Sequence, residues 1–178
     1  WRSVCTQITG YSHTWIKNDH STWTGCVMDR DNNNNYDVSI VTPTGASSNF
    51  YAENTTTCIN ATKSTIKLAP MLPLTDVRSD DGSTTPLSKA VDAMQANGNT
   101  NQTIGIIHGL QTLVSGDPYN AGTLPNDTTR VLIILSDGLN TQNRWSSSAS
   151  DINDREKLAC KAAKDQKDDR VGRLAGWR

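Results

Sequence analysis

The sequence predicts an α/β fold in which a mostly parallel central sheet is flanked by helices. Residues 131–135, VLIIL, are the most apolar run of the chain and have the length of a buried strand. Three segments with helical spacing of apolar residues surround this run, two before it and one after it. The alternation of helices with a strand that is apolar on both faces is typical of a parallel sheet covered by helices.

The first helical segment starts after Thr85, which is expected to cap a helix with Pro86 at its first position. Gly98 supplies a stop signal. Between these signals runs one apolar stripe, formed by Leu87, Ala90, Val91 and Met94.

The second helical segment is expected to begin near Thr100 and to end before Gly116. Its internal glycines, Gly105 and Gly109, each cost roughly 1 kcal/mol relative to alanine. Their spacing of four places both on one side, where a helix can approach a sheet closely. The third helical segment follows Asp151, which is expected to serve as its N-cap.

The chain divides into a polar, loop-rich part over residues 1–64 and the helix- and strand-bearing part over residues 65–178. In the first part only Val38–Val41 has the pattern of a short strand. At the start of the second, the segment Ser64–Leu74 begins with alternating apolar and polar residues and predicts an edge strand or a strand that ends at Pro70.

The charges nearly cancel, with 17 Lys and Arg against 18 Asp and Glu and a net charge of −1. This balance argues against a general surface for nucleic acid or anionic membrane. No run approaches the roughly 18 consecutive apolar residues that a membrane span needs. The abundance of Thr, Asn and Ser is typical of extracytoplasmic proteins.

The four cysteines are Cys5, Cys26, Cys58 and Cys160, and none forms a C-x-x-C pair. Widely spaced cysteines of even number suit two structural disulfides in an oxidising compartment, with three possible connectivities. Buried free thiols are the alternative.

Two loops carry the chemistry that the predicted fold would gather at one rim. Asp137 follows the predicted central strand, and Gly138 lets the backbone turn away. Thr100 lies at the start of the second helical segment. Ligands of open α/β sheets bind at the carboxyl ends of strands, and a hydroxyl with a carboxylate suits Mg²⁺, Mn²⁺ or Ca²⁺. The alternatives are that Asp137 only caps a turn and that Thr100 only caps a helix.

The segments "GNTNQTIGIIHGLQTL", "VLIILSDGLNTQNRW" and "WTGCVMDRD" resemble the von Willebrand factor A-type domain of the TadG-like (tight-adherence) pilus-assembly proteins. The resemblance covers roughly residues 23–164 and implies a Rossmann-like α/β domain with a long polar insertion. In that family a metal-ion-dependent adhesion site is built from three loops. Thr100 matches the threonine loop, and Asp137 matches the aspartate loop.

The resemblance also implies where this sequence departs from the family. No Asp-x-Ser-x-Ser loop occurs, and the family places that loop, the first strand, the first helix and the second strand before the point where this sequence begins. Two metal loops are too few for firm binding by this piece alone. Because Cys26 and Cys58 flank the insertion, the resemblance favours a disulfide between them. The charged segment after Ala163 lacks the strand that the family would have there.

Other polar clusters have simpler interpretations. "DRDNNNNYD", residues 29–37, is similar to a calcium-binding loop but lacks its glycine and its final glutamate, which favours a polar turn beside Cys26. His13 and His20 have no third ligand nearby, and His108 is expected to pack on its helix. Trp145 is expected either at the rim of the metal face or in the core.

The sequence therefore predicts a binding module that is not an enzyme. The resemblance implies that the module is part of a longer bacterial pilus-assembly protein, which is expected to be anchored in a membrane. It contacts a protein partner outside the cytoplasm, in the periplasm or cell envelope, through a divalent ion. The alternatives are a degenerate scaffold that does not use its metal site, and a metal-dependent hydrolase acting through Asp137. The hydrolase would require a second carboxylate and a base, for which the sequence offers no candidates.

Overall fold

The computed structural model describes residue 10, residues 12–14, 16, 19, 21 and 23, and the ranges 25–53, 69–78, 84–94, 98–122, 125 and 128–166. In this part of the chain the sheet is two-stranded and antiparallel. It pairs β1 (Cys26–Met28) with β2 (Tyr51–Glu53), and Val27 lies opposite Ala52. A central parallel sheet is not seen among these residues, and the α/β fold stays a prediction.

Arg30 organises the connection between β1 and β2, in which the 3-10 helices η2 (Tyr36–Val38) and η3 (Ala46–Ser48) lie. Its side chain is buried, and it donates to the carbonyl oxygens of Ser39 at 3.2 Å and Val41 at 2.8 Å. A third acceptor is the Ser48 carbonyl oxygen, 2.8 Å from Nε. Each bond satisfies a backbone group without a strand partner.

The strand predicted at Val38–Val41 is therefore wrong. Val38 ends η2 as a buried residue, and the next carbonyl groups turn toward Arg30 instead of entering a ladder. Asn35 starts η2 in the left-handed region at φ 57°, which asparagine tolerates better than most residues. A buried cation thus replaces the sheet pairing that the alternation of this segment suggests.

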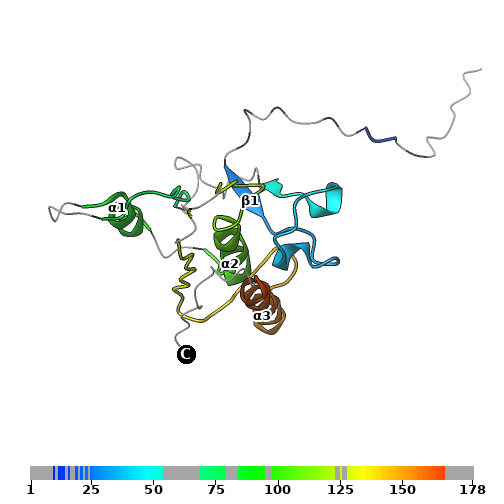
Figure 1. Cartoon of the computed structure of the whole chain (residues 1–178). Helices are drawn as coiled ribbons and strands as arrows, with labels where there is room; N and C mark the ends of the chain where they lie inside the picture. Colours follow the sequence, from blue (N-terminus) through cyan, green and yellow to red (C-terminus); the bar gives the residue numbers. More distant parts are fainter. Residues whose placement is uncertain are drawn as a thin grey trace, which may run out of the picture.

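Helix α1 (Pro86–Asp92) begins as predicted, with the Thr85 side chain accepting a hydrogen bond from the Ser88 backbone N–H at 3.2 Å. It ends at Asp92, well before Gly98. No residue of α1 is buried, and Leu87, Val91 and Met94 of its apolar stripe are exposed. Figure 1 shows α1 standing apart from α2 and α3.

The core lies where α2 (Gln102–Gln111) packs against α3 (Ala149–Asp165), as Figure 1 shows near the centre of the molecule. Its buried apolar residues are Val38, Ile106, Ile107, Leu110, Ile152, Ala159 and Ala163. The N-cap of α3 is Ser148, three residues before the predicted Asp151. Asp151 instead lies in the first turn, where its negative charge is favourable at the positive end of the helix.

The apolar run 131–135 is partly buried, on one side only. Leu132 and Ile134 pack against the core, whereas Ile133 is 75% and Leu135 97% exposed. Isolated bridges occur at Arg130 and Ile133. The structure thus differs from the expectation of a strand covered on both faces.

Helix α2 approaches this run closely at one of its two glycines. A Cβ atom added to Gly109 would lie 2.9 Å from Cδ1 of Leu132, and one added to Gly105 would meet nothing within 4 Å. Gly109 therefore lies close to this run and Gly105 does not, while the predicted approach of the helix to a sheet stays a prediction.

The edge strand predicted over residues 64–74 falls partly outside the described residues. Residues 69–74 lie inside them and form no strand. None of the helices in the described ranges has both the length and the apolar character that crossing a membrane demands.

Candidate functional site

Three loops meet at a polar junction centred on Asp29, which directly follows β1 and is 6% exposed. Both carboxylate oxygens accept hydrogen bonds from Nδ2 of Asn101, each at 2.9 Å. The backbone N–H of Arg144 donates to the same carboxylate at 3.1 Å, and the Arg144 side chain donates to the Asp29 carbonyl oxygen at 2.9 Å. One buried acid thus joins the loop before α2 to the loop before α3.

The loops of Thr100 and Asp137 are joined a second time through Thr100 and Thr141. The Thr100 N–H donates to Oγ1 of Thr141 at 2.7 Å, and the Thr141 N–H donates to the Thr100 carbonyl oxygen at 3.0 Å. Asn99 and Gln142 add a side-chain hydrogen bond of 2.6 Å beside this pair. These bonds fix the two loops next to each other.

Asn140 anchors the same loop to both core helices. Its Oδ1 accepts from the backbone N–H of Gln102 at 2.9 Å, and its Nδ2 donates to Asn153 at 2.9 Å and to Glu156 at 2.6 Å. The N-cap residue of α2, Asn101, makes no side-chain capping bond of its own. Asn140, only 3% exposed, therefore caps α2 from a distant part of the chain.

The two residues predicted to bind metal lie on these joined loops. Asp137 is exposed, and its Oδ1 accepts from the Leu139 N–H at 3.3 Å, which is the turn-capping role named as its alternative. Gly138 has φ +90° and makes the turn that this arrangement needs. Thr100 is half-buried and lines a hollow of about 280 Å³ together with Ser136.

The side chains at this rim have the oxygen chemistry that Mg²⁺ prefers, but few of them are charged. Thr100 and Ser136 line the hollow and offer hydroxyl groups, and Asp137, the next residue after Ser136, offers an exposed carboxylate. Within the described ranges, no three His, Cys, Asp or Glu side chains are grouped as a metal site would require. These oxygen atoms are of the type that binds a hard cation such as Mg²⁺.

Arg144 and Trp145 form the outer border of the junction. The Arg144 guanidinium lies 4.3 Å from the ring centre of Tyr51 and 4.4 Å from that of Trp145. Trp145 is 41% exposed and donates from Nε1 to the Arg30 carbonyl oxygen at 3.2 Å. Trp145 is therefore partly exposed beside Asp29 and Arg144, with its indole N–H bonded to the protein, and its place at a metal face stays a prediction.

The carboxylates of the calcium-like segment have different partners. Asp29 belongs to the junction, Asp31 accepts from the Asn33 N–H within the turn at 3.0 Å, and Asp37 pairs with Arg155 of α3. Burial raises the pKa of Asp37, and its hydrogen bonds with Arg155 oppose that change. These separate partners favour the polar turn over a calcium loop.

His108 packs against its surroundings, as its sequence context predicts. His108 is 9% exposed, and its Nδ1 lies 2.6 Å from the Tyr119 hydroxyl oxygen. Burial lowers the pKa of His108 and raises the pKa of Tyr119. His13 is exposed, and His20 lies outside the described residues.

Cys26 takes part in a disulfide bond, and Cys160 is a free thiol. Cys5 and Cys58 lie outside the described residues, so the pairing of Cys26 with Cys58 stays a prediction. Burial raises the pKa of the Cys160 thiol, which suits a packed cysteine more than a reactive one.

Sequence reasoning did not find Asp29, Asn140 or Arg144 as site residues. The available signal was the position of Asp29 directly after a short apolar strand, the same signal that identified Asp137.

No protein-family model matches the chain, and no curated protein or solved structure is significantly similar to it. The resemblance to the TadG-like von Willebrand A-type domain therefore rests on the sequence motifs alone.

Proposed function

We propose that the chain is a non-enzymatic binding module of an extracytoplasmic pilus-assembly protein of the TadG-like kind. It contacts a protein partner through the rim formed by the Thr100 and Asp137 loops. The observation that carries the proposal is the double attachment of these loops, by Asp29 and by the Thr100–Thr141 pair. A rim fixed in this way presents an exposed carboxylate on a preorganised backbone, which lowers the entropic cost of binding.

The metal part of the proposal assigns Asp137, Thr100 and Ser136 as the residues that would hold Mg²⁺ or Mn²⁺. When bound, the ion supplies an open coordination position for an acidic side chain of the partner. The protein side chains orient the ion and add one negative charge, so affinity in the absence of a partner is expected to be weak. No bond is broken, in keeping with a module that is not an enzyme.

The test is a calorimetric titration of the chain with Mg²⁺ and with Mn²⁺, in the presence of a short peptide that bears one glutamate. We expect saturable binding that Asp137→Ala abolishes and that EDTA reverses. Asp92→Ala is the matched control, because Asp92 is an exposed aspartate at the end of α1, outside the joined loops. A glutamine peptide should bind at least about tenfold more weakly, since it loses the charge–metal interaction.

Equal behaviour of Asp137→Ala and Asp92→Ala would contradict the metal assignment. Peptide binding that survives EDTA would leave a binding module without metal, which is the scaffold alternative. Turnover of a phosphoester that depends on Asp137 would overturn the proposal in favour of a hydrolase.

A further inference from the structure

A separate pocket of about 480 Å³ lies on one face of the β1–β2 sheet, within the size range of small-ligand sites. Four ring side chains line it, those of Trp23, Phe50, His108 and Tyr119. Its other walls are Val27 and Ala52, which lie opposite each other in the sheet, and Pro118. None of these seven residues belongs to the joined loops of the proposed metal rim.

The rings of this pocket are arranged edge to face. The ring centres of Phe50 and His108 are 5.6 Å apart at 62°, and those of His108 and Tyr119 are 5.9 Å apart at 64°. Trp23 is 50% exposed, yet its indole is fixed by a 2.7 Å hydrogen bond from Nε1 to the Cys26 carbonyl oxygen. A further planar ring can add to such an array in the same geometry.

The described residues that line the pocket include one polar pair. Nδ1 of His108 and the Tyr119 hydroxyl lie 2.6 Å apart, and no Asp, Glu, Lys or Arg is found among these described lining residues. Burial lowers the pKa of His108, which favours its neutral imidazole. An ionised ligand would therefore lose its hydration without gaining an opposite charge.

We propose that this pocket binds a neutral planar ring carrying one hydrogen-bonding group, of the size of a phenol or an indole. The ring packs among Trp23, Phe50 and Tyr119, and its polar group exchanges a hydrogen bond with the His108–Tyr119 pair. Such a ring can come from a free small molecule or from a Tyr or Trp side chain of a polypeptide.

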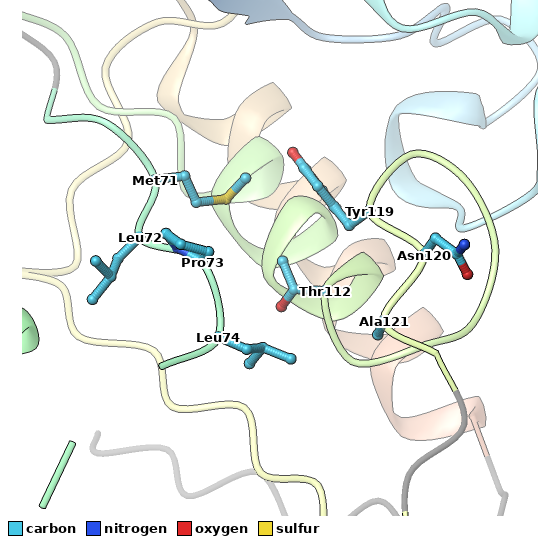
Figure 2. Close-up of a pocket in the computed structure, with 8 residues that line it drawn as sticks. All are labelled: Met71, Leu72, Pro73, Leu74, Thr112, Tyr119, Asn120 and Ala121. Atoms are coloured by element: carbon cyan, nitrogen blue, oxygen red, sulfur yellow. The ribbon is translucent and has the colours of Figure 1, made fainter. Parts of the chain in front are cut away.

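A neighbouring hollow of about 510 Å³ also includes Tyr119 but lacks these features. Figure 2 shows it between residues 71–74 and residues 119–121, with Thr112 of the α2 C-cap between them. Met71 and Leu74 are 53% and 68% exposed, and their segment forms no helix or strand. The ring array and the polar pair thus single out the pocket over the sheet.

The test measures binding of phenol and indole to the full 178-residue chain by calorimetry and by amide chemical shifts. Benzoate and benzylamine serve as charged probes of similar size. We expect saturable binding of phenol and indole in the millimolar range or tighter, and at least about tenfold weaker binding of the charged probes. A pentapeptide with a single central Trp distinguishes the sources, since tighter binding than free indole indicates a polypeptide ligand.

Two pairs of variants locate the site. Ala52→Phe fills the pocket and should weaken indole binding by about tenfold or more, whereas Ala149→Phe, at an exposed position of α3 outside the pocket, should not. Tyr119→Phe should weaken phenol binding by about three- to tenfold and leave toluene binding unchanged, because only the hydroxyl is removed. Tyr36→Phe, outside the pocket, is the control.

The proposal is overturned if neither phenol nor indole binds saturably, or if the charged probes bind equally well. Unchanged binding to both Ala52→Phe and Tyr119→Phe would overturn it too. Binding of phenol and indole requires neither Mg²⁺ nor Asp137. Failure of this proposal can therefore be distinguished from failure of the proposed metal site.

Discussion

Asp29 accepts hydrogen bonds from Asn101 and Arg144, which belong to two different loops. Its carboxylate is buried, and each of its oxygens has a donor facing it. An acid with this function cannot be told from an exposed aspartate by its immediate sequence, because its partners are distant in the chain. The residue that holds the rim is therefore known only from the structure.

Asp29→Asn is expected to lower the free energy of unfolding by about 1–3 kcal/mol, because an amide must face at least one donor with its own NH₂ group. Urea denaturation measures the change. Asp31→Asn is the matched control, since its turn contacts are exposed, and it should stay within about 0.5 kcal/mol. Equal effects of the two substitutions would mean that Asp29 does not hold the loops.

His108 makes stability depend on pH. Because burial lowers its pKa in the folded state, the unfolded chain takes up a proton first as pH falls. The stability that neutral His108 provides is therefore complete above the ordinary histidine pKa, near 6.5, and is lost as pH falls toward the lower folded value.

The difference in unfolding free energy between the natural chain and His108→Gln should fall from pH 7.5 to pH 5 by an amount of the order of 1 kcal/mol. Urea denaturation over this range measures it. His13→Gln, at an exposed histidine, should show no such slope. A pH-independent difference for His108→Gln would contradict the buried, neutral imidazole.

Among the helices, α2 makes the contacts that hold the core and the joined loops together. Its first turn is capped by Asn140, its middle packs on α3, and its glycines face different surroundings. The ion pair between Asp37 and Arg155 ties η2 to α3 beside it. Helix α1, by contrast, has its own cap and contributes no buried side chain.

Gly105→Ala should stabilise the chain by up to about 1 kcal/mol, because its added methyl group meets open space and alanine favours the helix. Gly109→Ala should gain less or lose stability, since its methyl group would press on Cδ1 of Leu132, which must turn aside. Thermal unfolding compares the two variants. A larger gain at Gly109 would show that α2 does not approach Leu132.

Across the whole molecule, much apolar surface stays exposed. Ile133, Leu135 and Leu139 are all more than half exposed, and they follow one another along the same run and loop. A small core of this kind gains from covalent constraint, and Cys26 provides it through its disulfide.

Peptide mapping without reduction is expected to find Cys26 linked to Cys58 and Cys160 free. Reduction should lower the free energy of unfolding by about 2–4 kcal/mol, since the open chain gains conformational entropy. Cys160→Ser is the control and should leave the mapped link intact. A link from Cys26 to Cys5 would refute the pairing but keep the constraint.

The three helices could be predicted from local sequence, because the Thr85 cap, the apolar spacing of residues 102–111 and the periodicity of residues 149–165 act within a few turns. The sequence also indicated Thr100 and Asp137 as candidate metal ligands, and hydrogen bonds join the loops that carry them. The tertiary structure alone decided that Arg30 replaces a strand at Val38–Val41, that Asn140 caps α2, and that one side of residues 131–135 is exposed. These outcomes depend on hydrogen bonds and burial between segments far apart in the chain, and local patterns carry no information about such partners.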